Sequence, residues 1–278
     1  MAKVAVAQML SGENLESNLE QAALLVEQAK SEGAELLLLP ENFAMLDSKA
    51  LIRLAASEER SSLIERTLSG LASRNKLWVI AGSVPLLVTE DEQIGGRQRV
   101  YASSLVYDES GQRCARYDKI HLFDVDVDDQ HAAYRESDFI QHGSGLTVVD
   151  SPAGTLGLSI CYDLRFPEQY QALRERGAEI LTVPSAFTAV TGEAHWEVLL
   201  RARAIETQCY VLAANQGGQH SATRSSWGHS MIISPWGEVI AERVESGPGI
   251  IVADIDLESL HKRRKAMPVM QHRLAAKL

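Results

Sequence analysis

The sequence has few of the residues that mark disulfide-rich or metal-binding proteins. Its three cysteines, Cys114, Cys161 and Cys209, are odd in number and far apart, which excludes a disulfide framework and a C-x-x-C motif. Free thiols at this low density are typical of a reducing compartment, so we expect a cytoplasmic protein. The eight histidines include no pair at ligand spacing such as H-x-x-x-H, so we expect no metal site.

Long apolar runs and an excess of positive charge are also absent. No apolar run approaches the ~18 residues of a membrane span. The N-terminal stretch MAKVAVAQMLSGENLE is broken by Gln8 and lacks a cleavage-like site, so we do not expect a signal peptide. A formal net charge of −10 disfavours nucleic acid and anionic membranes as partners. The 278 residues, 45% of them hydrophobic, are typical of a globular protein with a large core.

The hydrophobic pattern predicts strands connected both by helices and by hairpins. Apolar runs and alternation predict strands, which we place at 3–9, 36–39, 76–86, 177–187, 210–216 and 249–258. Helical spacing predicts helices, which we place at 15–33, 63–75, 167–176 and 194–208. Three hairpins are expected, with turns at 109–111, 152–154 and 235–237. These connections predict an α/β protein with mixed sheets and outer helices, and the lack of a Pro-, Gly- or Ser-rich linker predicts one domain over 1–278.

Two further features of the chain stand out. The segment AKSEGAELLLLPENF resembles RERGAEILTVPSAF about 145 positions later, which indicates either two similar halves or two unrelated helix–strand units that begin alike. Residues 123–145 are acidic and irregular, and loops of that length inside a compact domain are usually functional.

The stretch LSICYDLRFPE raises the question of what Cys161 does. An apolar strand ends at this cysteine and a helix begins at Pro167, a favoured first helical residue. Reactive groups gather at the carboxyl ends of strands in α/β sheets, and a nearby helix N-terminus lowers the pKa of a thiol. The pattern fits a nucleophile, and it also fits a buried structural thiol. Cys114 and Cys209 are interpreted as packing residues.

A nucleophilic cysteine needs a base, and the sequence offers several candidates. His121 and His195 are available, although neither follows a clear strand. Glu41 directly follows the buried run LLLLP, where burial would raise the pKa of a carboxyl group and suit it to act as a base. Lys119 ends a hairpin strand, and a fixed ammonium can stabilise an oxyanion. Taken singly, Glu41 also fits a helix start and Lys119 a surface charge.

Glu, Lys and Cys at three strand ends, in that chain order, resemble the nitrilase superfamily of carbon–nitrogen hydrolases. The resemblance covers nearly the whole chain and rests on several independent motifs. They are LLLPENF, YDKIHLFD, GLSICYDLRFPE, GAEILTVPSAF, TGEAHWEVLLRARAIETQCYV and GHSMIISPWGEVIAE. The segments PSAF and HWEVLLRARAIETQCYV are most similar to the Nit branch, the deaminated glutathione amidases.

The resemblance implies a fold and a chemistry. It implies a four-layer α-β-β-α sandwich that forms a homodimer, and hydrolysis of a linear amide through a cysteine thioester without a metal or an organic cofactor. Carried over by position, Cys161 is the nucleophile, Glu41 the general base and Lys119 the oxyanion partner. Glu136 occupies the place of a second glutamate, and its alternative interpretation is a solvated loop charge.

Residues that bind substrate are also expected near Cys161. Arg165, four residues further on, suits a substrate carboxylate, or instead an ion pair with Glu168 or Asp163. The backbone N–H of Tyr162 suits the oxyanion. Three further candidates follow the strand at 177–187 or lie in the next helix, namely Phe187, Thr191 and His195, the last of which also suits a structural role.

These observations favour an amidase that acts on a small 2-oxo acid amide bearing a carboxylate, with deaminated glutathione first. The alternatives within the class are an ω-amidase acting on 2-oxoglutaramate and a carbamoylase. A non-catalytic metabolite-binding relative is disfavoured because Glu41, Lys119 and Cys161 are all present. A redox-sensing thiol protein is disfavoured because no resolving cysteine is close in sequence.

Overall fold

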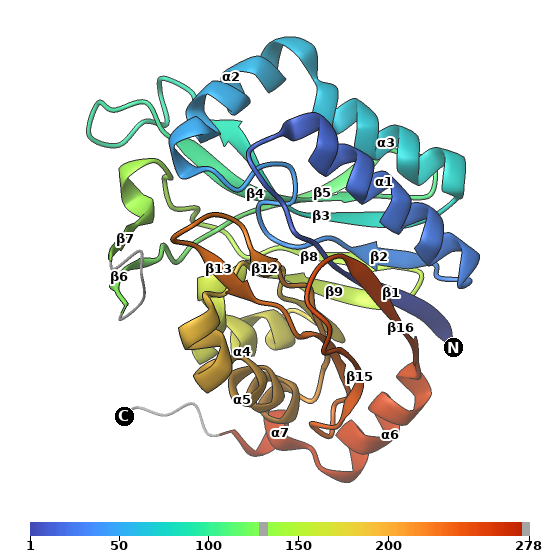
Figure 1. The fold of residues 1–278 in the computed structure, drawn as a ribbon. Coiled ribbons are helices and arrows are strands. Elements are labelled where there is room, and N and C mark those ends of the chain that lie inside the picture. The colour runs from blue at the N-terminus through green and yellow to red at the C-terminus, as the bar shows by residue number, and fades with distance from the viewer. Residues whose placement is uncertain (128–132, 274–278) are drawn as a thin grey trace.

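Two six-stranded sheets lie face to face at the centre of the protein, and helices cover their outer faces (Figure 1). The computed structural model describes residues 1–127 and 133–273. In order across the first sheet, the strands are β16 (Gly249–Ile255), β1 (Ala2–Gln8), β2 (Leu36–Leu38), β3 (Trp78–Leu87), β4 (Val100–Tyr107) and β5 (Arg113–Asp118). Those of the second sheet are β15 (Val239–Arg243), β14 (Ser230–Ile233), β11 (Tyr210–Ala213), β10 (Ile180–Thr182), β9 (Gly154–Leu158) and β8 (Val148–Ser151).

Helices, two small ribbons and three 3₁₀ turns complete the described part of the chain. The α-helices are α1 (Leu15–Ser31), α2 (Leu51–Ser61), α3 (Leu63–Asn75), α4 (Pro167–Glu175), α5 (Ala189–Thr207), α6 (Leu257–Ala266) and α7 (Val269–His272). Two small ribbons pair β6 (Asp124–Asp126) with β7 (Ala133–Arg135), and β12 (Gly217–Gln219) with β13 (Ser225–Trp227). Single 3₁₀ turns lie at Ser48–Ala50, Glu136–Asp138 and Cys161–Arg165.

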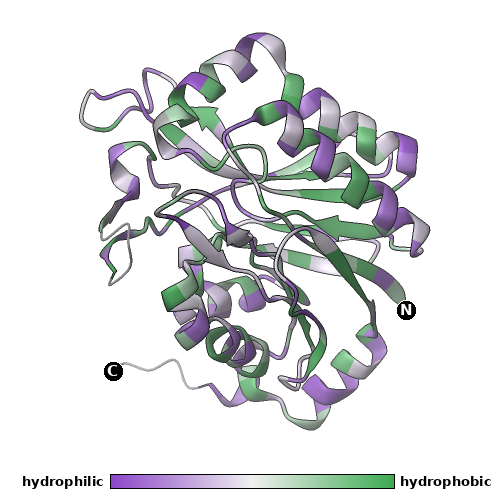
Figure 2. Cartoon of the chain, viewed as in Figure 1, coloured by the Kyte–Doolittle hydropathy of each residue, from purple (hydrophilic) through white to green (hydrophobic). Residues whose placement is uncertain are grey.

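The alternation of side chains along β1 explains the layers. Val4 and Val6 pack in a core shared with residues of the second sheet such as Leu158, whereas Ala5 and Ala7 pack under the first helices. Both faces of the central strands are therefore apolar. Figure 2 shows these strands mostly green, between helices that carry both purple and green residues. The predicted four-layer α-β-β-α sandwich is confirmed.

The two sheets have the same topology. In the first, β1, β2 and β3 are parallel, with β16 antiparallel on one side and β4 and β5 on the other. In the second, β9, β10 and β11 are parallel, with β8 on one side and β14 and β15 on the other. The two similar segments seen in the sequence form α1–β2 and α4–β10, which occupy equivalent positions in the two sheets.

Some predicted boundaries were wrong. The helix expected to begin at residue 194 begins at Ala189, because the side chain of Thr188 caps it by accepting a hydrogen bond from the N–H of Thr191. The sequence pattern missed α2 altogether. The segment 123–145 was expected to be irregular, but it contains β6, β7 and a 3₁₀ turn, while its residues 128–132 lie outside the described residues. None of the helices in the described ranges is long and apolar enough to cross a bilayer.

Candidate active site

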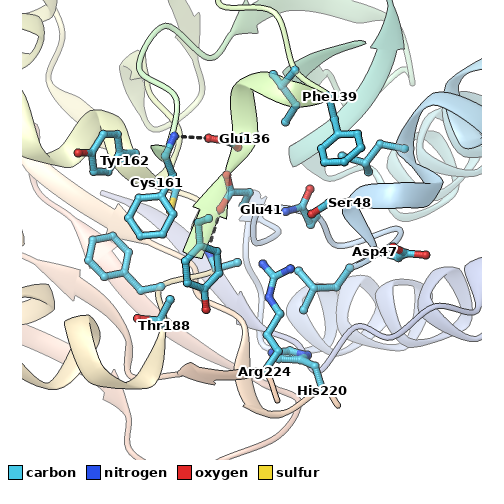
Figure 3. A pocket seen from close by; sticks show the side chains of 18 of the residues that line it. Glu41, Asp47, Ser48, Glu136, Phe139, Cys161, Tyr162, Thr188, His220 and Arg224 are labelled. Atoms are coloured by element: carbon cyan, nitrogen blue, oxygen red, sulfur yellow. Dashed lines mark hydrogen bonds between the residues drawn. The ribbon is translucent and has the colours of Figure 1, made fainter. Parts of the chain in front are cut away.

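The ends of three strands bring the predicted chemical groups together. Glu41 lies just beyond β2, Lys119 directly follows β5, and Cys161 begins the 3₁₀ turn after β9. These strands belong to both sheets, so face-to-face packing brings the ends of the first sheet against those of the second. Glu41, Lys119, Glu136 and Cys161 all line one cavity of about 550 Å³ (Figure 3).

A buried ion-pair network holds the charged members of the site. The ammonium of Lys119, 1% exposed, lies 2.8 Å from Oε1 of Glu41 and 2.8 and 2.9 Å from the two carboxylate oxygens of Glu136. Burial alone would lower the pKa of Lys119, but the charges of Glu136 and Glu41 outweigh it and raise that pKa well above its ordinary value. Burial also raises the pKa of Glu136. Lys119 is therefore a charged group between two carboxylates, and not a surface residue.

The position of Glu41 is fixed by neighbours from the second sheet. Its Oε2 accepts a hydrogen bond from the N–H of Ala186 at 3.0 Å, and its backbone carbonyl accepts one from the side-chain amide of Gln216 at 3.0 Å. Gly82 in β3 passes so close that an added Cβ would lie 2.1 Å from the carbonyl oxygen of Leu39. Glu41 is therefore buried and rigid, as a positioned base requires.

Cys161 sits in a strained and buried turn. Its φ of 48° is in the left-handed region that non-glycine residues rarely adopt, and its N–H donates to the carbonyl of Pro184 at 2.9 Å. Burial, and then the negative charge of Glu41, raise the pKa of the thiol well above its ordinary value, whereas Lys119 lowers it. The expected lowering of this pKa by the helix N-terminus is therefore wrong: two carboxylates already neutralise Lys119, and desolvation dominates.

Asp163 connects the segment of Cys161 to that of Lys119, a role that the sequence analysis missed. Its Oδ2 accepts from the Tyr117 hydroxyl at 2.7 Å and from the N–H of Ile160 at 2.8 Å. Its Oδ1 accepts from the N–H and from Nδ1–H of His121, at 3.0 and 2.8 Å. The carboxylate is fully buried, so the alternative ion pair between Asp163 and Arg165 is wrong.

Most of the predicted binding residues line the cavity. Tyr162, Arg165, Phe187 and Thr191 do so, and the guanidinium of Arg165 lies 5.7 and 5.6 Å from the ring centres of Tyr162 and Phe187. His195 is exposed and outside the lining, although its Nδ1 is 3.4 Å from both terminal nitrogens of Arg165. The structure thus brings His195 beside Arg165 and not into the pocket.

The far side of the cavity contains residues that sequence reasoning did not identify. They come from the loops after β2 and β12 and include Asn42, Asp47, Ser48, His220 and Arg224. The only signal was the polar stretch HSATRSS, which is typical of any surface loop. Burial lowers the pKa of His220 to about 4, so this imidazole is neutral near pH 7.

The remaining cysteines and the acidic groups provide no second site. Cys209 is fully buried and packs as predicted, whereas Cys114 lies on an exposed strand surface, contrary to the packing interpretation. All three cysteines are free thiols. Among the described residues, no group of three or more His, Cys, Asp or Glu side chains has an arrangement that would hold a metal ion.

Comparison with known proteins identifies the family. The sequence profile named Carbon-nitrogen hydrolase matches residues 3–265. The chain belongs to the carbon–nitrogen hydrolase family. It is 46% identical over 271 residues to a deaminated glutathione amidase of Yersinia enterocolitica, a match that covers 98% of this chain and 92% of that protein.

Two other relatives extend this result. A deaminated glutathione amidase of Mus musculus is 45% identical over 271 residues, which is 97% of this chain and 82% of that protein. The crystal structure of Saccharomyces cerevisiae Nit3, a member of branch 10 of the nitrilase superfamily, superimposes with a TM-score of 0.82 at 30% identity and covers 98% of this chain and 97% of that one. This carbon–nitrogen hydrolase therefore has the nitrilase-superfamily fold and is an amidase-type hydrolase by family, as predicted.

Proposed function

We propose that this hydrolase cleaves the amide bond of deaminated glutathione through a thioester on Cys161. The observation that carries the proposal is the convergence of a buried thiol, a fixed carboxylate and a buried ammonium in one cavity. The high pKa of Cys161 means that the thiol is protonated in the resting enzyme. A base must therefore remove this proton as sulfur attacks, and Glu41 is beside it.

The acylation step follows from these positions. Sulfur of Cys161 attacks the amide carbonyl carbon while Glu41 takes the thiol proton. The N–H of Tyr162, which has no hydrogen-bond partner among the described residues, donates to the oxyanion, and the charge of Lys119 stabilises it. One such donor contributes ~10²–10³ in rate. Glu41 then gives the proton to the amide nitrogen, and the carbon–nitrogen bond breaks to release the amine.

Deacylation uses the same carboxylate in reverse. Glu41 removes a proton from a water molecule as its oxygen attacks the thioester carbon. The carbon–sulfur bond then breaks, and Glu41 returns the proton to the departing sulfur, which gives a carboxylic acid and the thiol. Proton transfer of this kind contributes ~10²–10⁴ in rate. Glu136 holds Lys119 from the opposite side, and so keeps the ammonium in place while the proton on Glu41 comes and goes.

The substrate assignment rests on the relatives and on the size of the cavity. Two of these relatives, 46% and 45% identical to this chain, are named deaminated glutathione amidases. A cavity of about 550 Å³ lies within the ~300–1,000 Å³ typical of pockets that enclose drug-sized ligands. Deaminated glutathione is a 2-oxo acid joined by an amide to cysteinylglycine and would fill more of this space than 2-oxoglutaramate, which lacks the dipeptide. An ω-amidase and a carbamoylase are therefore the second candidates.

The deciding experiment compares kcat/KM for deaminated glutathione and for 2-oxoglutaramate on the same enzyme. We expect the higher value for deaminated glutathione. An equal or reversed preference would reject the substrate while leaving the amidase chemistry intact. Rapid acid quenching followed by peptide mass mapping should find the 2-oxoglutaryl adduct on Cys161 and on neither Cys114 nor Cys209. The Cys161→Ala variant should form no adduct and no product.

We also propose that the enzyme is a cytoplasmic homodimer. Three free cysteines support a reducing location.

Exposed apolar side chains of α5 and of the neighbouring hairpin support a surface that a second copy covers, namely Val198, Ile205, Trp236 and Ile240. Light scattering at micromolar concentration should give twice the monomer mass, and a Val198→Glu change should shift it towards the monomer.

A further inference from the structure

Three arginines line the catalytic cavity, and they differ in what their guanidinium groups contact. Arg135 donates to a carboxylate oxygen of Asp126 at 2.6 Å and to two backbone carbonyls. Arg165 lies over two aromatic rings and beside His195. The guanidinium of Arg224 has no hydrogen bond or ion pair with any residue that the structure describes, although the residue is half-buried.

The loop that carries Arg224 is nevertheless held in place. The carbonyl oxygen of Arg224 accepts hydrogen bonds from the N–H groups of His220 and Ser221 at 2.9 and 3.2 Å. His220 donates from Nδ1 to the carbonyl of Ser11 at 2.9 Å, and its Nε2 is 2.9 Å from the hydroxyl of Ser226. The guanidinium therefore lines the cavity from an anchored turn, and the residues that the structure describes supply no anionic partner for it.

The position of Arg224 relative to the catalytic groups indicates which part of a substrate it would meet. In Figure 3, Cys161 and Tyr162 lie to the left of Glu41, whereas Arg224 lies below it, beside His220. Arg165 is on the side of Cys161, because it lies over the ring of Tyr162. The two cationic groups thus approach the reacting centre from different sides of the cavity.

The chemistry of the proposed reaction orients the substrate between them. The acyl carbon bonds to sulfur, so the 2-oxo acid part lies on the side of Cys161, where Arg165 suits its carboxylate. The amide nitrogen must face Glu41, which protonates it, so the leaving amine extends past Glu41. In deaminated glutathione this amine is a dipeptide that ends in a carboxylate.

We propose that Arg224 binds the terminal carboxylate of the leaving dipeptide and so selects amides with an anionic tail. The inference rests on the proposed function and adds a second anion subsite to it. Asp47 also lines this cavity and has an interaction of its own.

The test measures release of 2-oxoglutarate from three amides. They are deaminated glutathione, its analogue with the terminal carboxylate converted to an N-methylamide, and 2-oxoglutaramate. In Arg224→Gln, we expect the ratio of kcat/KM for deaminated glutathione to that for 2-oxoglutaramate to fall by about tenfold or more, as for a lost charge-assisted hydrogen bond. On the wild type, kcat/KM for the N-methylamide should be lower than that for deaminated glutathione by the same factor. The Arg224→Gln change should not lower kcat/KM for the N-methylamide any further.

Two controls make the result specific. Arg135→Gln removes a guanidinium from the same cavity that already has Asp126 as its partner, and it should leave the ratio unchanged. Equal effects of Arg135→Gln and Arg224→Gln, or no effect of the N-methylamide on the wild type, would overturn the subsite. The analogue arm needs no variant, so it decides the matter even if Arg224→Gln fails to fold. If the wild type does not cleave deaminated glutathione at all, the proposed function fails together with the subsite.

Discussion

The ammonium nitrogen of Lys119 lies 2.8 Å from Oε1 of Glu41, although 78 residues separate them in the chain. Both side chains are at least 95% buried, so neither charge is compensated by water. Such a pair is expensive to build, because desolvation of two ions offsets their attraction. Its presence beside the buried thiol of Cys161 is best explained by chemistry and not by stability.

Removal of the carboxylate charge should abolish most of the activity. In Glu41→Gln, the amide cannot accept the thiol proton, and we expect kcat/KM to fall by ~10²–10⁴. The matched control is Glu13→Gln, which neutralises an exposed carboxylate of the same cavity and should retain activity within a few-fold. Steady-state kinetics on both variants, with circular dichroism to verify folding, would check this. A Glu41→Gln enzyme of near wild-type activity would contradict the assignment of the base.

Removal of the ammonium should destabilise the fold. In Lys119→Met, the buried Glu41 and the partly buried Glu136 would lose their cation. Breaking a buried pair costs ~3–5 kcal/mol of the free energy of unfolding. The double variant Lys119→Met/Glu136→Gln should recover part of this loss, since only one uncompensated carboxylate remains. Urea unfolding of the three proteins gives the comparison. A loss below ~1 kcal/mol in the single variant would show that water reaches the site.

Arg165 should contribute to the binding of every substrate that has a 2-oxo acid end. We expect Arg165→Ala to lower kcat/KM for both deaminated glutathione and 2-oxoglutaramate by a similar factor, because both present the same carboxylate. This common loss distinguishes Arg165 from Arg224, whose effect should depend on the tail. Kinetics with the two substrates side by side provide the check. If Arg165→Ala has wild-type kinetics, Arg165 is not a binding residue.

His220 should make the stability depend on pH. Burial lowers its pKa in the folded protein to about 4 from an ordinary value of 6.5. Between these values the unfolded chain binds the proton and the folded one does not, so the free energy of unfolding should decrease as pH falls through this window. The slope from one proton is at most ~1.4 kcal/mol per pH unit. The urea midpoint should change less between pH 5 and pH 7 in His220→Gln than in the wild type. The same change in both proteins would contradict the assignment.

Asp163 should affect both stability and turnover. In Asp163→Asn, the amide nitrogen cannot accept, so donors among Tyr117, Ile160 and His121 would be left buried without a partner. Each unsatisfied donor costs ~1–3 kcal/mol. The turn of Cys161 would also lose its connection to the segment of Lys119, so we expect a lower kcat. Tyr117→Phe removes a single donor and should cause a smaller loss in thermal unfolding. Equal melting temperatures for Asp163→Asn and wild type would contradict this.

The amino-acid sequence by itself predicted mixed sheets with outer helices, and its family resemblance indicated the candidate reacting groups. Apolar runs such as 36–39 are buried on both faces whatever packs on them, so a strand there was predictable. Glu41 follows such a run, Lys119 follows a hairpin strand and Cys161 ends an apolar strand, so all three were predictable as residues at strand ends. Local capping decided more than propensity did: Thr188 starts α5 five residues before the predicted start, in a stretch containing Gly192.

The tertiary structure alone decided the electrostatics and the contacts of the site. The pKa of Cys161 depends on burial and on Glu41, which are set by packing between the two sheets, and local sequence gave the wrong direction. The contacts of Asp163 likewise join segments that are distant in the chain. The position of His195 outside the cavity lining, and the lack of a partner for the Arg224 guanidinium among the described residues, also follow from the tertiary structure. Pairwise electrostatics and cavity shape depend on distances in space, and no local pattern of residues encodes those distances.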